Sequence, residues 1–283
     1  MRPFTALSLG AGQGSTALAI AIIQGLTREV RPGKVYDFSE ITLDKITFAD
    51  TGDEIASTYE HVEKFEAWLK SKGVTLEVVR KEGISLSDSI RERIEGRRKS
   101  ASAIPAFLAP TGKAAQHCTR DWKSRPLDRS VKRAAGKGRT VEVLIGFTIE
   151  EWMRIPAKMP KEWPALWTRR YPLIEAGANR GWCVDVCLEH LGYVPQSSAC
   201  AHCPHRPDVG PGSRTWIRDN EPETWKKVVA FDALIRDGSS WGLRQPAFLS
   251  KTLLPAELAL EAANRQGMIE FGADGCDSGR CFT

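Results

Sequence analysis

A glycine-rich segment near the N-terminus has the residue types of a phosphate-binding loop. It reads Ser8-Leu9-Gly10-Ala11-Gly12-Gln13-Gly14-Ser15-Thr16. Glycines let backbone N–H groups approach an anion closely, hydroxyls add donors, and a helix N-terminus carries a partial positive charge. No lysine precedes Ser15, so the segment is not a Walker A loop, whereas Gly12-x-Gly14-x-x-Ala17 fits the looser dinucleotide-binding pattern. The alternative is a purely structural turn between a strand and a helix.

Cysteines form the second group of residues with chemical potential. The chain has seven cysteines and no secretory signal, so metal or redox roles are favoured over disulfides. The spacing of Cys200 and Cys203 lets two thiolates bind one metal, and Cys183 and Cys187 are one helical turn apart. Four such thiolates would suit tetrahedral zinc or a [4Fe-4S] cluster. The alternative is a pair of buried, reduced cysteines.

Alternating strands and helices must position these groups. Short apolar stretches predict strands at residues 4–9, 46–49, 75–79 and 140–146, and helical patterns lie between them at 17–26, 57–72 and 87–99. This alternation predicts an α/β fold in which a parallel sheet carries helices on both faces. The glycine-rich loop then follows the first strand at its carboxyl end, where open parallel sheets bind ligands.

The pattern changes after about residue 150. Residues 151–172 are rich in aromatic residues and proline, which predicts an irregular packed lobe, and helices are expected at 180–191 and 222–236. We therefore expect a nucleotide-binding α/β domain over residues 1–150. A smaller C-terminal lobe, helical and cysteine-bearing, is expected over residues 151–283.

Several segments together resemble the PP-loop ATP pyrophosphatase superfamily, in particular its branch containing phosphoadenosine phosphosulfate (PAPS) reductase. The glycine-rich loop is followed by Asp50-Thr51-Gly52 at the end of the second strand and by Thr58-Tyr59 on the next helix. Further matches, in family order, are Cys118-Thr119-Arg120-Asp121-Trp122-Lys123-Ser124-Arg125-Pro126-Leu127, Ile145-Gly146 through Arg154, Tyr171-Pro172-Leu173 and Cys200-Ala201-His202-Cys203. The resemblance covers about residues 4–236, and Gly14 stands where the family loop has an aspartate.

The resemblance implies an adenine-nucleotide α-hydrolase-like fold that binds ATP, or PAPS, with Mg²⁺. The nucleotide contacts it implies are Ser8, Gly10, Ala11, Gly12, Gln13, Gly14, Ser15, Thr16, Asp50, Thr51, Gly52, Lys123, Arg125 and Arg154. Catalytic roles are expected for Ser15, Asp50, Lys123, Cys276 and Cys281. The family's cysteine pattern favours Cys118, Cys183, Cys200 and Cys203 as ligands of an iron-sulfur cluster or zinc.

The function expected from this resemblance is ATP-dependent adenylation followed by sulfur transfer to a nucleic acid or nucleotide, with a sulfur-donor protein as a further partner. One alternative is a reductase that releases sulfite from PAPS or adenylyl sulfate through Cys276 or Cys281. Another is a non-catalytic binding module, because Gly14 lacks the carboxylate of the family loop.

Charge is unevenly distributed along the chain. The formal net charge is +5, but residues 80–139 contain sixteen Lys or Arg and six Asp or Glu, a net of +10. This basic segment predicts an anionic partner, and its size favours nucleic acid over one small nucleotide. The alternative is a solvated surface.

Hydropathy predicts that the protein does not enter a membrane. The longest apolar candidate begins at Ala17 and is interrupted at Gln24 and Gly25, far short of the ~18–20 residues that cross a bilayer. The N-terminus has no signal-peptide pattern, so a cytoplasmic location is expected.

Overall fold

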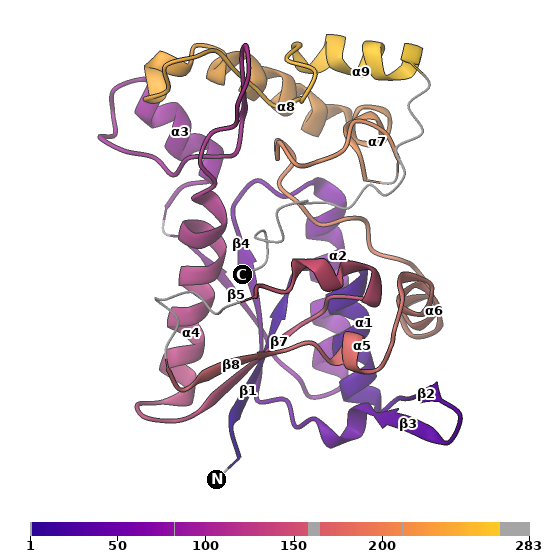
Figure 1. Cartoon of the computed structure of the whole chain (residues 1–283). Coiled ribbons are helices and arrows are strands. Elements are labelled where there is room, and N and C mark those ends of the chain that lie inside the picture. Colours follow the sequence, from indigo (N-terminus) through magenta and orange to yellow (C-terminus); the bar gives the residue numbers. More distant parts are fainter. Residues whose placement is uncertain (1, 82, 158–164, 211, 267–283) are drawn as a thin grey trace.

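A five-stranded parallel sheet forms the centre of the computed structural model, which describes residues 2–81, 83–157, 165–210 and 212–266 (Figure 1). The strand order is β5-β4-β1-β7-β8, and every neighbouring pair is parallel. The strands are β1 (Phe4–Leu9), β4 (Lys45–Asp50), β5 (Leu76–Arg80), β7 (Val141–Ile145) and β8 (Trp167–Arg170). The predicted α/β class with a parallel sheet is confirmed.

Helices cover both faces of this sheet, because alternate residues of each strand point to opposite sides. Leu7 and Leu9 of β1 share one core with α1 (Gln13–Gln24), α2 (Ala56–Ser71) and α6 (Arg180–Leu191). Phe4 and Ala6, on the other face, share a second core with Val131 of α4 (Arg125–Ala135). Figure 1 shows α4 on the opposite side of the sheet from α1, α2 and α6.

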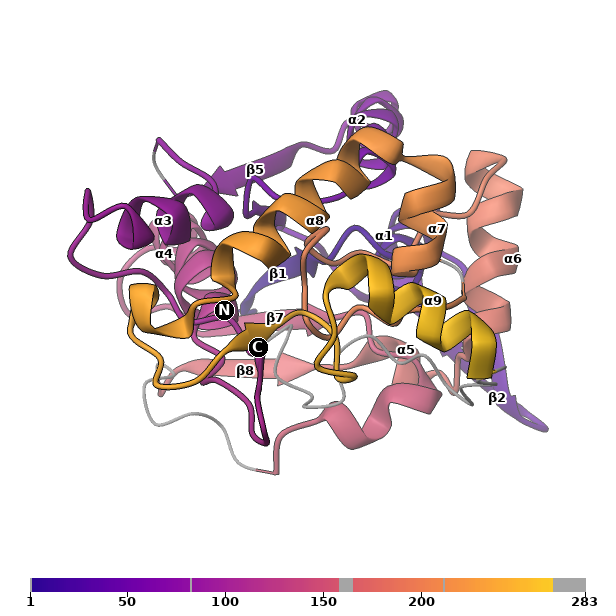
Figure 2. The same ribbon diagram turned by 90° about the horizontal axis from the view of Figure 1, so that it is seen from above.

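A third core lies beyond the carboxyl ends of the strands (Figures 1 and 2). It is built by α3 (Leu86–Ile94), α7 (Arg214–Asn220), α8 (Pro222–Ile235) and α9 (Ala256–Gln266). A short antiparallel pair, β6 (Phe107–Leu108) and β9 (Ala247–Phe248), joins it. Buried Cys200 belongs to this core, so the expected C-terminal helical region with buried cysteines is present.

Some elements differ from the sequence-based expectation. The segment 151–172, expected to be irregular, contributes the edge strand β8 and leads into the short helix α5 (Pro172–Glu175). A hairpin of β2 (Thr27–Arg31) and β3 (Lys34–Asp37) follows α1 and was not expected. The cores also cross residue 150, since α3 packs with the C-terminal helices and α6 packs on the sheet. The division into two domains at residue 150 stays a prediction.

The topology creates a natural ligand crevice. The chain passes from β1 outward to β4 and β5, and later returns to β7 and β8 on the other side of β1. Loops that follow β1 and β7 therefore lead in opposite directions, and in open parallel sheets ligands bind at this switch point. None of the described helices is long and apolar enough to cross a membrane.

Candidate nucleotide site

A pocket of about 670 Å³ opens at the carboxyl ends of β1, β4 and β7. Its volume is in the range of small-molecule and cofactor sites. Loops that lie far apart in the sequence meet in its wall. The predicted site residues among those lining it are Ser8, Gly10, Gly12, Gln13, Gly14, Ser15, Thr51, Cys118, Lys123, Arg154, Cys183, Cys200 and Cys203. The structure therefore brings the glycine-rich loop, the strand-end threonine and the cysteine segments to one place.

The glycine-rich loop is held in shape by its own hydrogen bonds. Gly10 N–H donates to Ser15 Oγ at 3.0 Å, and Ser15 Oγ donates to the Gly12 carbonyl at 3.3 Å. Ala11 is buried and has a left-handed backbone (φ 57°). Helix α1 begins at Gln13 without a side-chain cap, so its first backbone N–H groups can donate hydrogen bonds to an anion.

Gly14 lies against the loop that follows β7. A Cβ atom on Gly14 would lie 2.3 Å from the Gly146 carbonyl oxygen, and one on Gly146 would lie 2.5 Å from Ser15 Cα. The two backbones therefore touch, and neither position accepts a side chain without displacing the other loop. This contact explains physically why an acidic residue is absent from position 14.

Asp50 is buried and shapes its own turn. Its carboxylate accepts hydrogen bonds from Gly52 N–H at 2.7 Å, from the Tyr59 hydroxyl at 2.9 Å and from Arg80 Nε at 2.9 Å. Asp50 and Gly52 do not line the pocket. The left-handed backbone of Gly52 (φ 80°) brings it against Ser85, where a Cβ would lie 2.7 Å from the serine Cβ. In this arrangement Asp50 holds the turn that carries Thr51 without lining the pocket itself. Its predicted catalytic role stays a prediction.

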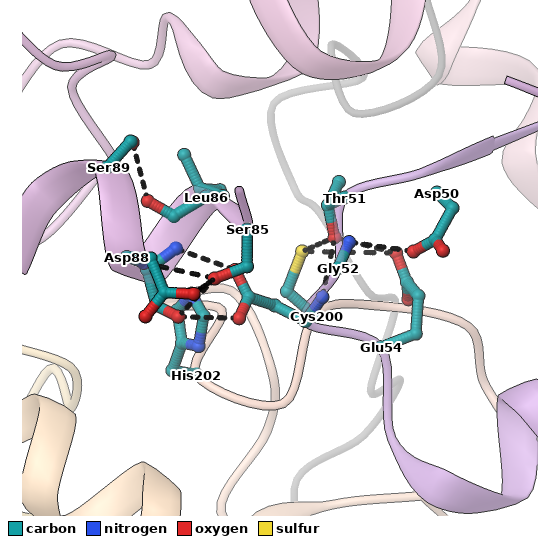
Figure 3. Close-up of polar contacts among 12 residues, drawn as sticks. Asp50, Thr51, Gly52, Glu54, Ser85, Leu86, Asp88, Ser89, Cys200 and His202 are labelled. Atoms are coloured by element: carbon teal, nitrogen blue, oxygen red, sulfur yellow. Dashed lines mark hydrogen bonds and ion pairs between the residues drawn. The ribbon is translucent and has the colours of Figure 1, made fainter. Parts of the chain in front are cut away.

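Thr51 connects this turn to the loop that carries Cys200 and Cys203, called here the cysteine loop (Figure 3). Its hydroxyl lies 3.2 Å from Cys200 Sγ and 3.3 Å from Glu54 Oε1. Cys200 and Glu54 form an isolated antiparallel bridge, and Ala201 N–H donates to the Asp53 carbonyl at 2.7 Å. The cysteine loop is thus docked on the strand-end turn by backbone hydrogen bonding.

Lys123 and Glu54 form a buried ion pair at the pocket. Lys123 Nζ lies 3.3 Å from Glu54 Oε1, and the Glu54 side chain is fully enclosed. Burial lowers the pKa of Lys123, but the Glu54 carboxylate and neighbouring cysteines outweigh this and raise the pKa above its ordinary value. The amine is therefore a cation in the pocket wall. Sequence reasoning gave Glu54 no role, although it lies two residues beyond Asp50-Thr51-Gly52.

The cysteine loop is organised by buried Arg206. Its guanidinium donates to the backbone carbonyls of Ala199, Cys200 and Gly212. His202, on the same loop, stacks against Phe231 with ring centroids 4.1 Å apart. Both His202 and Arg206 line the pocket, and neither of them was assigned to the site from the sequence. The available signal was the position of His202 between Cys200 and Cys203 and of Arg206 between two prolines.

The cysteines divide into two groups. Cys203 interacts electrostatically with both Cys118 and Cys200, whereas Cys183 has Cys187 as its neighbour on α6. Burial raises the pKa of the Cys118 thiol to about 11. Within the described ranges, no three His, Cys, Asp or Glu side chains are placed to hold one metal ion. The residues as arranged do not fit a metal ion or cluster, so the assignment of iron-sulfur or zinc to these cysteines stays a prediction.

Other predicted contacts lie at varying distances from the pocket. Arg154 lines it, pairs with Glu151 and stacks over the Phe147 ring at 4.5 Å. Arg125 is exposed, pairs with Asp121 at 3.0 Å and does not line the pocket.

Thr16 faces away from the pocket-lining side of the glycine-rich loop. Thr16 is fully buried, and its hydroxyl lies 3.0 Å from His61 Nε2, on the helix side of the loop. Cys276 and Cys281 lie outside the described residues.

The fold and the pocket define an α/β protein whose strand order is consistent with a Rossmann-like or adenine-nucleotide α-hydrolase fold. No model of a known protein family matches the chain, and no curated protein matches it in sequence.

Proposed function

We propose that the protein is a nucleotide-dependent enzyme of the PP-loop, PAPS reductase-like type, which adenylates an acceptor with ATP and then transfers sulfur to it. The observation that carries the proposal is the pocket in which the glycine-rich loop, Lys123 and four cysteines meet. A phosphate-binding loop beside thiols is the combination that such a reaction needs. The acceptor class we favour is nucleic acid.

Phosphate binding follows from the loop itself. The uncapped N-terminus of α1 and the glycines before it would direct amide donors toward a triphosphate. Lys123 adds a fixed cation, and preorganised donors of this kind stabilise charge that develops in a transition state. Mg²⁺ would accompany ATP and neutralise phosphate charge; such ions need only one or two protein carboxylates.

The first chemical step is attack of an acceptor oxygen on the α-phosphorus. The new bond joins that oxygen to the α-phosphorus, the bond from the α-phosphorus to the bridging oxygen breaks, and pyrophosphate leaves with the electron pair. The acceptor carbon is then bonded to an adenylyl leaving group. The loop amides and Lys123 hold the phosphates during this exchange.

The second step uses a persulfide delivered by a sulfur-donor protein to one of the pocket cysteines. The terminal sulfur attacks the activated carbon, the carbon–oxygen bond breaks, and AMP leaves. A second cysteine attacks the first at sulfur, which releases the thiolated acceptor and leaves a disulfide. An external thiol supplies the two electrons that reduce it. Cys118, Cys200 and Cys203 are the candidates that lie together.

Two observations favour other candidate functions. The thiols beside the phosphate loop also suit a reductase that releases sulfite from PAPS. The enclosure of Asp50, together with the side-chain-free position of Gly14, suits a binding module that does not cleave ATP.

The test is incubation of the purified protein with Mg-ATP and candidate nucleic acid acceptors, with AMP and pyrophosphate measured. The proposal predicts acceptor-dependent release of both products, lost in Lys123→Gln and retained in Lys64→Gln, a surface lysine paired with Glu60 on α2. Thermal melting of each variant checks folding. Sulfite release from PAPS without ATP cleavage would establish the reductase instead, and nucleotide binding without turnover would establish the binding module.

A further inference from the structure

The basic segment of the chain separates into two surfaces in the folded protein. At the end of α3, the arginines are neutralised locally: Arg97 pairs with Glu95 at 2.9 Å, and Arg98 pairs with Glu92 at 3.1 Å. Residues 91–99 still contain five Lys or Arg and two Glu, a net of +3. This end of α3 therefore accounts for only part of the net +10 of residues 80–139.

The outward face of α4 keeps its charge. Its exposed cations and those of the turn that follows are Arg125, Arg129, Lys132, Arg133 and Lys137. Arg125 pairs with Asp121 and Arg133 lies 3.4 Å from Glu77, but Arg129, Lys132 and Lys137 have no ion pair among the described residues.

Helical geometry explains why these cations share one face. At 3.6 residues per turn, positions 125, 129, 132 and 133 fall within an arc of about 100° around the helix and so lie on one side of it. Val131 and Ala135 point to the other side and pack on the sheet. The only acidic residue of α4, Asp128, is partly buried and interacts with Arg169, so it does not offset the exposed charge.

We propose that this face, defined as Arg125, Arg129, Lys132, Arg133 and Lys137, binds the sugar–phosphate backbone of a nucleic acid whose reacting nucleotide enters the pocket. The proposal deepens the proposed function, because it names the surface that holds the acceptor. Helix α4 continues directly from the π-helical turn Thr119–Ser124, which carries the pocket lysine Lys123. A strand held along α4 therefore leads to the pocket.

The dimensions and chemistry of the face suit a phosphodiester chain. Eleven residues of helix extend about 16 Å, which matches the rise of roughly five nucleotides at 3.4 Å each along one strand. A membrane-surface helix would need large apolar side chains beside its cations. None of the exposed large apolar residues of the described chain lies on α4.

The test is fluorescence anisotropy of end-labelled 20-nucleotide probes, as single-stranded and duplex DNA and RNA, at several salt concentrations. The altered protein is Arg129→Gln/Lys132→Gln/Lys137→Gln. The matched control is Arg97→Gln/Arg98→Gln/Lys99→Gln, which removes the same formal charge from the end of α3. Thermal melting establishes that both variants are folded, and ATP binding is measured in parallel.

We expect the wild type to bind at least one probe with salt-dependent affinity. The α4 variant should lose tenfold or more in affinity at 0.1 M salt, and its slope of log affinity against log salt should fall by about 2–3, because three phosphate contacts are removed. The control should stay within threefold of the wild type. A preference for DNA or for RNA identifies the acceptor, and either supports the proposal.

Three results would overturn the inference: equal binding by the α4 variant and the wild type, no salt-dependent binding to any probe, or stronger binding to phosphatidylserine vesicles than to every probe. ATP binding should be unchanged in the α4 variant. If the α4 variant loses nucleic acid binding but still cleaves ATP in the presence of a small acceptor, the α4 face is separate from the proposed catalytic function. Failure of ATP cleavage with intact α4-dependent binding would reject the catalytic proposal alone.

Discussion

His61, on α2, contacts two other parts of the fold through its two ring nitrogens. Nε2 lies 3.0 Å from the Thr16 hydroxyl on α1, and Nδ1 lies 3.1 Å from the Tyr193 hydroxyl. Burial lowers the pKa of His61 from 6.5 to about 4. The folded protein therefore contains a neutral imidazole at physiological pH.

This shift predicts a pH-dependent stability. The unfolded chain protonates His61 near pH 6.5 and the folded protein only near pH 4, so the unfolded state binds more protons between these values. The contribution of His61 is complete above pH 6.5 and is lost as the pH falls. Between pH 7.5 and 4.5, urea unfolding of the wild type should lose about 2–3 kcal/mol more than that of His61→Gln. Parallel pH profiles would contradict this reading.

The Glu54–Lys123 pair makes a second prediction at the scale of single residues. Glu54→Gln leaves a buried ammonium without its counter-ion and should lower the free energy of unfolding by about 3 kcal/mol. We place the effect at the low end for buried pairs because 19% of the Lys123 side chain is exposed. The double variant Glu54→Gln/Lys123→Gln should cost less than the sum of the single changes.

The surface pair Glu60–Lys64 is the matched control for that experiment. Exposed pairs contribute only about 0.2–1 kcal/mol, so Glu60→Gln should stay within that range. If Glu54→Gln and Glu60→Gln had equal effects on denaturant unfolding, the buried pair would have no special role.

At the scale of elements, the start of α1 and the end of β7 are locked together by backbone contact. Gly14→Ala would place its Cβ 2.3 Å from the Gly146 carbonyl oxygen, and the overpacking should cost about 1–3 kcal/mol. Gly12→Ala, in the same loop, meets only Ser198 at 3.7 Å and should cost under about 1 kcal/mol. Chemical denaturation of both variants tests this, and an equal loss would show that the contact does not constrain the loop.

Sequence patterning predicted the elements whose apolar periodicity is strong. Strands β1, β4 and β7 were expected because each is a mostly buried apolar run, and β5 was expected because its sequence alternates. Strand β8, Trp167–Arg170, was missed because it lies at a solvated edge of the sheet and its sequence is therefore mostly polar. Helix α4 was recognisable in principle, since Pro126 lies in its first turn and Leu127, Val131 and Ala135 repeat every fourth residue.

At the scale of the whole molecule, the site depends on contacts that local patterns do not encode. The glycine-rich loop and the strand-end turn were expected to meet, because parallel strands place their carboxyl ends at one edge. The contact between Cys200 and Thr51 joins residues 149 positions apart. It depends on the conformation of the cysteine loop, which Arg206 holds by hydrogen bonds to backbone carbonyls. By contrast, Cys183 and Cys187 are neighbours one turn apart on α6, which the sequence spacing already indicated, and only their burial in the core shared with α1 is a long-range effect.

If the protein has the proposed function, its pocket holds a nucleotide with the phosphates on the glycine-rich loop. The most direct measurement is a crystal structure grown with Mg²⁺ and α,β-methylene-ATP, whose carbon bridge prevents cleavage at the α-phosphorus. We expect phosphate oxygens within hydrogen-bond distance of the backbone amides of residues 11–15 and near Lys123 Nζ. A nucleotide bound outside this pocket, or an empty pocket at a saturating concentration of the analogue, would contradict it.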